Sequence, residues 1–181
     1  MYLLDKNSDH TELCLGIARD GAIARGINDI IVASTTGKTG IIAARMLQGM
    51  GMNLIIVTHN VGFKEEGAYE LSNEKRLEIT GFGARILTGT MVLRGIGAAI
   101  RDKGGYSHEQ VVADTLRIFG QGAKVCCEIT AMASDAGLIG TKEVIAVAGT
   151  GHGADCVCVI KPASSNKFFE MRVIEILAKP R

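Results

Sequence analysis

The chain has 181 residues, 47% hydrophobic and 22% charged, with 23 glycines and only 2 prolines, which fits one domain over 1–181 and excludes a disordered chain. Its net charge of +1, without a run of Lys and Arg, gives no reason to expect a nucleic-acid partner. Every apolar stretch is too short to cross a bilayer and the N-terminus lacks a signal-peptide pattern, so we expect no membrane partner and a cytoplasmic location.

The spacing of apolar residues predicts helices and strands in alternation along the first half of the chain. In chain order these are a helix over 11–25, a strand over 29–33, a helix over 40–49, a strand over 53–58, a loop over 59–68, a short helix from 72 that fails near 81–83, and a strand over 85–88. Ser8 or Asp9 can cap the first helix, and Gly26 ends it.

The second half of the chain predicts two helices followed by three strands. The first helix runs from a cap at Ser107 to 119 and the second over 123–136, although β-branched residues at the start of the second are also compatible with a strand. The strands cover 143–148, 156–161 and 171–177. Alternating strands and helices imply a mostly parallel sheet covered on both faces, whereas strands without an intervening helix pair antiparallel or mixed. We therefore expect a three-layer α/β/α sandwich with five to seven strands and antiparallel or mixed pairing at its C-terminal edge.

The cysteine pattern argues against a disulfide framework and against a metal site. The cysteines are odd in number and have no CxxC spacing: Cys14, Cys126, Cys127, Cys156 and Cys158. We interpret them as small buried side chains in a reducing cytoplasm, with a redox role as the minor alternative. We also expect no bound metal, because no His, Cys or carboxylate cluster has ligand spacing.

The most informative loop is Ser34-Thr35-Thr36-Gly37-Lys38-Thr39-Gly40, which lies between a buried strand and the start of a helix. The N–H groups at a helix start lack intrahelical acceptors and carry partial positive charge, so they attract an anion. Gly37 permits close approach of the backbone, the hydroxyls donate hydrogen bonds, and Lys38 adds a full charge. The loop is therefore predicted to hold a phosphate.

Parallel α/β sheets place ligands beyond the carboxyl ends of their strands, so the residues after the other strands are also candidates. These are Thr58, His59 and Asn60 after the second strand, Thr88, Gly89 and Thr90 after the third, and Gly149, Thr150, Gly151, His152, Gly153, Ala154 and Asp155 after the fourth. The second glycine-rich loop, 149–155, could lie close to a flat ring or a sugar.

The common phosphate-binding motifs do not fit this chain. A Walker A loop requires glycine where Val32 stands, and no later strand ends in the Asp that such enzymes use for their metal. The sequence Gly149-Thr150-Gly151 begins a dinucleotide GxGxxG pattern, but Ala154 replaces its last glycine and a strand follows instead of a helix.

Two phosphate loops match better. The run Ser34-Thr35-Thr36-Gly37-Lys38-Thr39 resembles the [ST]-x-T-G-x-T loop with which flavodoxins wrap the phosphate of FMN. It also resembles the [ST]-x-[ST]-G-[RK]-[ST] loop in the C-terminal domain of pyruvate kinases, which grips a phosphate of the sugar-bisphosphate effector. This second resemblance extends to 143–161 and covers about two thirds of the chain, whereas 60–72 and 162–181 have no counterpart.

The resemblance implies a stand-alone relative of the pyruvate kinase C-terminal α/β domain. It implies no pyruvate kinase activity, because that chemistry belongs to a barrel larger than this chain. It assigns Ser34, Thr36, Gly37, Lys38 and Thr39 to a phosphate grip and 149–155 to a loop that closes over the ligand. Since the related domain makes subunit contacts, the resemblance also implies a homo-oligomer.

One departure from the family pattern bears on the ligand. Thr35 stands where animal-type relatives often place a Lys, so Lys38 is the one cation of the loop. One phosphate is easier to accommodate there than two, which favours a monophosphate such as FMN over a sugar bisphosphate. A flavodoxin proper is disfavoured, because the chain begins with a helix, has no Trp and is nearly neutral.

Catalytic groups are harder to assign. His59 and His152 both lie at strand ends beside the predicted pocket and are the candidates for acid–base chemistry or phosphate binding. Glu128 and Asp135 share a helix face, which we interpret as a solvated edge or as helix-end contacts rather than a catalytic pair. No arrangement of nucleophile, base and orienting group can be assembled from the sequence.

The sequence thus leads to three functional hypotheses. The favoured one is a flavoprotein-like binding protein for a phosphorylated small molecule, with FMN as its cofactor or ligand. The alternatives are an enzyme, either a flavin-dependent oxidoreductase or one that acts on a sugar phosphate, and a regulatory or oligomerisation module that has kept no ligand.

Overall fold

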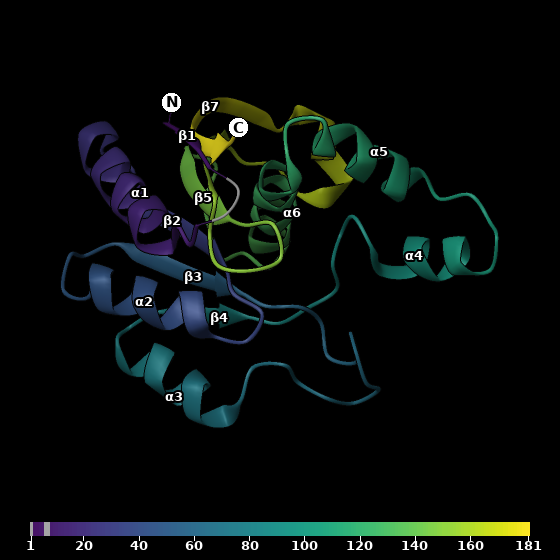
Figure 1. The fold of residues 1–181 in the computed structure, drawn as a ribbon, viewed down its shortest axis with the longest axis horizontal. Coiled ribbons are helices and arrows are strands. Elements are labelled where there is room, and N and C mark those ends of the chain that lie inside the picture. Colours follow the sequence, from purple (N-terminus) through teal and green to yellow (C-terminus); the bar gives the residue numbers. More distant parts are fainter. Residues whose placement is uncertain (1, 6–7) are drawn as a thin grey trace.

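The computed structural model describes residues 2–5 and 8–181 and has helices on both faces of one seven-stranded sheet (Figure 1). Its elements are β1 (Tyr2–Leu4), α1 (Thr11–Arg25), β2 (Asp29–Ala33), α2 (Lys38–Leu47), β3 (Asn53–Val57), α3 (Asn73–Gly81), β4 (Arg85–Leu87), α4 (Gly95–Asp102), α5 (His108–Arg117), α6 (Gln121–Asp135), β5 (Val144–Ala148), β6 (Cys156–Lys161), a 3-10 helix η1 (Ser165–Glu170) and β7 (Arg172–Pro180).

The sheet is parallel in one half and mixed in the other. Its strand order is β1-β7-β6-β5-β2-β3-β4. The four strands from β5 to β4 run parallel, because helices provide the crossovers between them. β6 pairs antiparallel with both β5 and β7, and β1 pairs parallel with β7. The predicted fold class, including the antiparallel pairing at the C-terminal edge, is confirmed.

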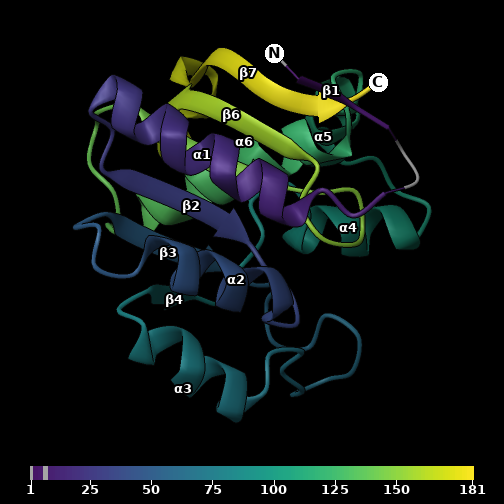
Figure 2. The same cartoon turned by 60° about the vertical axis from the view of Figure 1, so that its left-hand side comes forward.

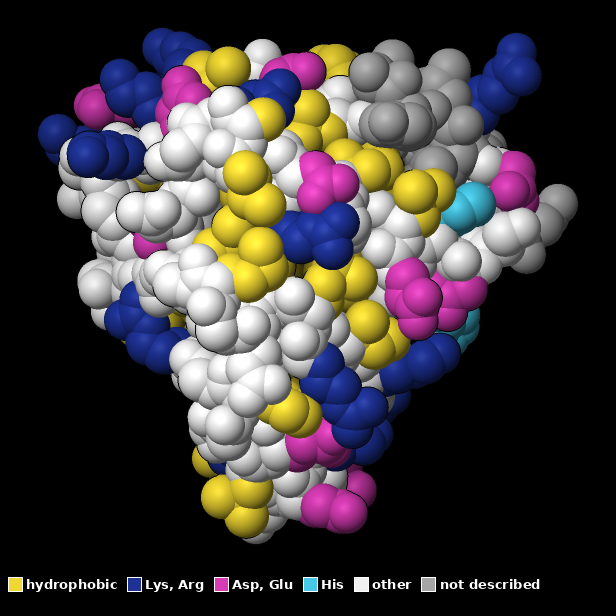
Figure 3. Space-filling model, turned by 90° about the vertical axis from the view of Figure 1, so that its left-hand side faces the viewer, with side chains coloured by type: hydrophobic (Ala, Val, Ile, Leu, Met, Phe, Trp, Pro, Cys, Tyr) yellow, Lys and Arg dark blue, Asp and Glu magenta, His cyan; other side chains and the backbone are white. Residues whose placement is uncertain are grey.

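The alternation of side chains along the strands divides the core into two layers. Ile30, Val32 and Ile56 pack toward α1, α2 and α3 on one face of the sheet, whereas Ile31 and Ile55 pack toward α6 on the other. Figure 2 shows α1 and α2 side by side over the first of these faces. On the outer surface of that side, charged side chains of both signs are interspersed with apolar ones (Figure 3), in keeping with the small net charge.

Several expected element boundaries were wrong. The first helix has His10 at its N-cap instead of Ser8 or Asp9, although Asp9 still accepts a hydrogen bond from the backbone N–H of Thr11. α2 begins at Lys38, two residues earlier than expected, and α6 is helical from Gln121 with no strand at its start. β1, α4 and η1 were not predicted, whereas β7 confirms the strand expected over 171–177 and extends it to Pro180.

All five cysteines are free and buried, which confirms their interpretation as core side chains. The sulfur atoms of Cys126, Cys156 and Cys158 lie within 4.8 Å of one another, between α6 and β6. Across the described residues, no helix combines the length and the apolarity needed to span a membrane.

Candidate functional site

The loop between β2 and α2 presents free backbone N–H groups. The first i to i−4 hydrogen bond of α2 runs from the N–H of Ile41 to the carbonyl of Gly37 (2.9 Å), and the N–H of Gly40 donates to the buried hydroxyl of Ser34 (2.9 Å). The N–H groups of Lys38 and Thr39 therefore have no acceptor within the helix. They are available to an anion, whereas the Ser34 hydroxyl is used to hold the turn.

Glycine is required at the N-cap of α2. Gly37 has φ +89°, in the left-handed region, and a Cβ built there would lie 2.6 Å from Cδ1 of Leu71. The main chain of this loop is further held by Lys75, whose Nζ donates to the carbonyl of Thr36 (3.1 Å). These contacts fix the direction of the N–H groups before any ligand arrives.

The loop forms one end of a cavity of about 660 Å³ that extends to α6. Eleven of the residues predicted from the sequence line it: Ser34, Thr35, Thr36, Lys38, Thr39, Thr58, His59, Gly149, Gly151, His152 and Gly153. They belong to the loops after β2, β3 and β5, which confirms that these strand ends meet at one edge of the sheet.

The remaining candidates lie elsewhere. Gly37 and Gly40 belong to the turn of the first loop, where Gly37 is the N-cap of α2 and the N–H of Gly40 donates to Ser34. Asn60, Thr88 and Gly89 border a neighbouring cavity of about 500 Å³, and the hydroxyl of Thr88 is hydrogen-bonded to that of Thr58 (2.7 Å). The N–H of Thr150 donates to the carboxylate of Asp155 (3.0 Å), so this pair shapes its own loop.

The second glycine-rich loop is attached to the start of α1. The N–H of Ala154 donates to the hydroxyl of Thr11 (3.0 Å), and a Cβ at Gly153 (φ +62°) would lie 2.4 Å from that hydroxyl. Hydrogen bonds from Thr11 lower the pKa of Asp9, which also lies 3.6 Å from Nζ of Lys38. His152 is exposed at the rim of the cavity.

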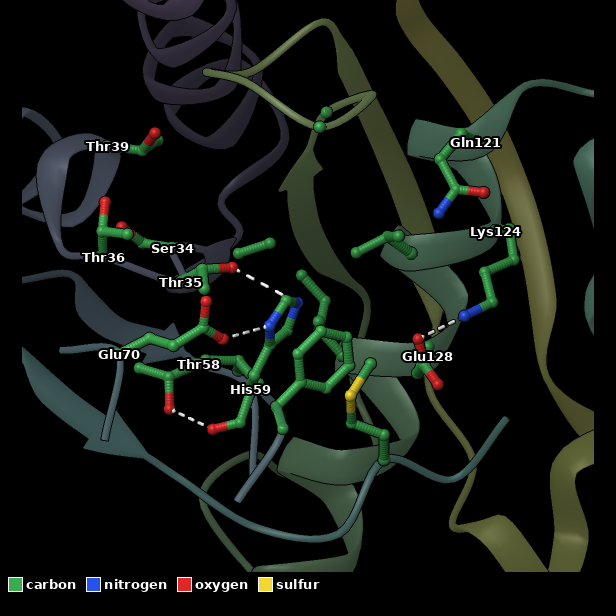
Figure 4. A pocket seen from close by; sticks show the side chains of 18 of the residues that line it. Ser34, Thr35, Thr36, Thr39, Thr58, His59, Glu70, Gln121, Lys124 and Glu128 are labelled. Atoms are coloured by element: carbon green, nitrogen blue, oxygen red, sulfur yellow. Dashed lines mark hydrogen bonds and ion pairs between the residues drawn. The ribbon is translucent and has the colours of Figure 1, made fainter. Parts of the chain in front are cut away.

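His59 has a partner on each side of its ring. Its Nδ1 lies 2.7 Å from Oε2 of Glu70, and its Nε2 lies 3.3 Å from Oγ1 of Thr35 (Figure 4). Phe63 packs against the ring with centroids 3.9 Å apart. Burial would raise the pKa of Glu70, but hydrogen bonds from Lys64 and His59 outweigh it and lower that pKa. Glu70 is therefore ionised at neutral pH.

A buried ion pair lies across the cavity on α6. Nζ of Lys124 lies 2.5 Å from Oε2 of Glu128, and the two side chains are only 4% and 1% exposed. Oε1 of Glu128 accepts a hydrogen bond from the N–H of Leu93 (3.0 Å), whose carbonyl accepts one from the side chain of Gln110 (2.6 Å). The interpretation of Glu128 as part of a solvated edge was wrong, because the segment around Leu93 covers that side of α6. Asp135 does make a helix-end contact, with the N–H of Ser165.

Between these two ends the cavity is apolar. Its walls there are Val57, Met91, Val125, Ile129 and Met132. Figure 4 shows the hydroxyl groups of the 34–39 loop on one side and Lys124 and Glu128 on the other. Such a cavity suits a ligand with an anionic end and a flat apolar body.

Basic side chains in the cavity outnumber acidic ones by five to three. Lys38, Lys64 and Lys124 lie beside Asp9, Glu70 and Glu128 respectively. Of the two others, Arg117 pairs with Asp114, and the guanidinium of Arg94 lies 4.8 Å above the ring of Phe63. Lys38 is the one cation of its loop, as predicted, but other segments add positive charge that the sequence did not assign to the site.

Sequence reasoning missed Glu70, Lys64, Arg94 and Lys124 as cavity residues. Glu70 and Lys64 belong to the segment 60–72, which has no counterpart in the family that the chain resembles, and Arg94 precedes the unpredicted α4. Lys124 and Glu128 are spaced i, i+4 on a helix, which is a recognisable ion-pair signal, but it does not reveal burial.

No family model matches the chain. Among solved structures, a pyruvate kinase from Cryptosporidium parvum is similar over 88% of this chain and 24% of its own, with 16% identity and a TM-score of 0.47. An O-ureido-L-serine synthase matches 61% of this chain and 29% of its own at 21% identity and TM-score 0.34. A hydrogen sulfide-producing enzyme from Fusobacterium nucleatum matches 44% of this chain and 24% of its own at 18% identity and TM-score 0.33.

Pyruvate kinases thus stand among the structural neighbours, as the resemblance implied. The chain spans about a quarter of the length of the pyruvate kinases it matches. These likenesses are too distant to carry an argument about activity, and the fold class rests on the strand order of this chain itself.

Proposed function

We propose that the cavity binds a phosphate monoester of a flat, largely apolar group, and that FMN is such a ligand. The observation that carries this proposal is the start of α2, where the N–H groups of Lys38 and Thr39 face no acceptor within the helix. A phosphate there would accept from these N–H groups and from nearby hydroxyls, and Lys38 would add a charge-assisted contact.

The rest of the cavity supports the same class of ligand. A flat ring system would lie along Val57, Met91, Val125, Ile129 and Met132, while Arg94, which forms no ion pair with another described residue, favours an anion. The volume of about 660 Å³ is within the ordinary range for a site that encloses a small organic ligand. The start of α6 also has a glycine N-cap, Gly120, and its first residue, Gln121, lines the same cavity, so the preference for a monophosphate rests on Lys38 being the one cation of the 34–40 loop.

The test compares FMN with riboflavin, which has the same ring but no phosphate. Quenching of flavin fluorescence on titration with the protein should show FMN bound more tightly than riboflavin. The double variant Lys38→Ala/Thr39→Ala should bind FMN at least about tenfold more weakly, since each hydrogen bond to a charged group contributes about 1.5–3 kcal/mol. Binding of riboflavin should change little.

A matched control is Lys167→Ala/Thr80→Ala, which removes the same side chains from exposed positions outside the cavity. Circular dichroism of both double variants checks that the fold is kept. Equal affinity for FMN and riboflavin, or an unchanged FMN affinity in Lys38→Ala/Thr39→Ala, would overturn the proposal.

A further inference from the structure

The three residues Thr35, His59 and Glu70 form a continuous hydrogen-bonded line that ends in the cavity. Thr35 lies in the loop after β2, His59 follows β3, and Glu70 precedes α3, so the fold alone brings them together. Oγ1 of Thr35 is 3.3 Å from Nε2 of His59, and Nδ1 of His59 is 2.7 Å from Oε2 of Glu70. Figure 4 shows Thr35 and His59 pointing toward one another.

The charge of Glu70 determines which nitrogen of His59 carries the proton. An ionised carboxylate can only accept, so Nδ1 carries the hydrogen and donates it to Glu70. In the neutral ring Nε2 is then a lone-pair acceptor, and the Thr35 hydroxyl donates to it. The ring is also held by Phe63, and Glu70 is held by Lys64 at 2.8 Å.

The side chains of His59 and Glu70 differ in their exposure to solvent. The side chain of Glu70 is 12% exposed, whereas that of His59 is 30% exposed and borders the cavity. Both residues border the cavity, and the base is the more exposed of the two.

We propose that Thr35 is a nucleophile, with His59 as its general base and Glu70 as a positioning residue, and that the site cleaves small carboxylic esters. Nucleophile, base and orienting group in hydrogen-bond order are the signature of covalent acyl transfer. The separation of 3.3 Å is slightly longer than the usual range of about 2.6–3.2 Å, and such contacts often tighten only when substrate binds. This inference uses the same cavity as the proposed FMN site but does not depend on phosphate binding.

The free N–H groups of α2 give the proposal its second element. Thr35 stands just before the helix that begins at Lys38, so the developing negative charge on a carbonyl oxygen would form near the N–H groups at the helix start. The apolar walls of Met91, Val125 and Ile129 suit an apolar acyl or alcohol group. The substrate class is therefore an uncharged ester with an apolar body.

The reaction balances with water as the one co-reactant. Oγ1 of Thr35 forms a bond to the carbonyl carbon while its proton passes to Nε2 of His59. The bond from that carbon to the alcohol oxygen then breaks, and the alcohol leaves with the proton from Nε2. Water next attacks the acyl-Thr35 ester and gives a proton to Nε2, and Oγ1 takes that proton as its bond to the acyl carbon breaks. The products are an acid and an alcohol, and nothing is oxidised or reduced.

The test uses a fluorophosphonate, which stays bound to an activated hydroxyl, and hydrolysis of 4-nitrophenyl butyrate. The intact protein should gain one phosphonyl group, and peptide mapping should place it on Thr35. The variants Thr35→Val and His59→Gln should lose about a hundredfold or more in the rate of labelling and of hydrolysis. Thr35→Ser keeps the hydroxyl, so the phosphonyl group should be found on the new serine at position 35. This variant keeps the test decisive if the valine variant does not fold.

The positioning role of Glu70 has its own readout. Glu70→Gln should lower the plateau rate of hydrolysis and move the midpoint of its pH profile downward, because the carboxylate no longer stabilises protonated His59. A merely structural contact would lower the rate without moving the midpoint. Matched controls on exposed positions outside the cavity are Thr80→Val, His108→Gln and Glu74→Gln, which should behave as the wild type.

Two results would overturn the inference. One is a label found on lysine or on any residue other than Thr35, and the other is a Thr35→Val protein that folds and hydrolyses the ester at the wild-type rate. The outcome is separate from that of the FMN proposal, because labelling is measured without flavin. A protein that ignores FMN yet is labelled on Thr35 would refute only the flavin proposal, and the reverse pattern would refute only this one.

Discussion

Replacing Lys124 by methionine tests how the far end of the cavity is held together. The substitution keeps an unbranched side chain one atom shorter, but it leaves the carboxylate of Glu128 without its cation, 1% exposed and 2.5 Å from where the ammonium stood. Removing one partner of a buried pair costs about 3–5 kcal/mol of unfolding free energy. For a chain of this size that corresponds to a fall of roughly 6–20 °C in melting temperature.

A second variant separates the ion pair from the packing around it. Lys124→Met/Glu128→Gln removes both charges but leaves an amide oxygen to accept from the N–H of Leu93, as Oε1 of Glu128 does now at 3.0 Å. Since a buried pair replaced as a whole is often neutral in stability, this double variant should recover most of the loss. The single variant is expected to be the less stable protein although it carries fewer changes.

Urea unfolding followed by circular dichroism gives the three free energies. The control is Lys167→Met, which breaks an exposed pair with Glu170 (3.9 Å; 63% and 69% exposed) and should cost about 0–1 kcal/mol. The reasoning is refuted if Lys124→Met costs no more than Lys167→Met, or if the double variant is less stable than the single one.

Two further predictions concern the loop and the core. Gly37→Ala should lower the free energy of unfolding by about 1–3 kcal/mol, because φ is +89° and the new Cβ meets Leu71 at 2.6 Å. The same change at Gly16, which has open space inside α1, should raise that free energy by about 0.5–1 kcal/mol. Urea unfolding measures both variants, and equal effects would contradict this prediction. All five thiols are buried away from a reagent in solution, and burial also raises the pKa of Cys14 to about 12 and of Cys127 to about 11. A disulfide reagent such as DTNB should therefore modify no thiol of the native protein and five in urea, and rapid reaction of the native protein would count against the buried core.

The part of the site that the sequence predicts best is the part that is contiguous in the chain. The strand, the 34–40 loop and the start of α2 are neighbours in sequence, so local rules for glycine, hydroxyls and helix starts suffice to place them. The meeting of this loop with His59 and with 149–153 also follows from one rule, because the carboxyl ends of neighbouring parallel strands share an edge.

The part that could not be predicted comes from segments whose position depends on tertiary packing. Glu70 reaches His59 through the irregular segment before α3, which has no periodic pattern to place it. Glu128 is polar at a helical position, and only the packing of α5 and the segment around Leu93 against α6 makes that position buried. For the same reason no triad could be assembled from the sequence, although two of its members were singled out.

Short or glycine-containing elements were also missed. β1 has three residues and gains its place only by pairing with β7, at the opposite end of the chain. α4 contains Gly95 and Gly97 and has no side-chain cap, so its local helix propensity is low. Both elements are specified by contacts distant in sequence, which a single sequence does not display.

Thr35 is the nucleophile of the proposed esterase and lies in the same loop as the proposed phosphate site, so its chemistry makes the two functions exclusive. Its hydroxyl has one proton, which it can donate either to Nε2 of His59 or to the oxygen of a bound phosphate. When a phosphate accepts that proton, His59 loses the donor on its cavity side and the hydroxyl is no longer activated. The N–H groups of Lys38 and Thr39 would be occupied at the same time, so they could not stabilise the negative charge on a carbonyl oxygen. The cavity can therefore hold a phosphate monoester or cleave an ester at any one moment, but the arrangement of its groups does not permit both together.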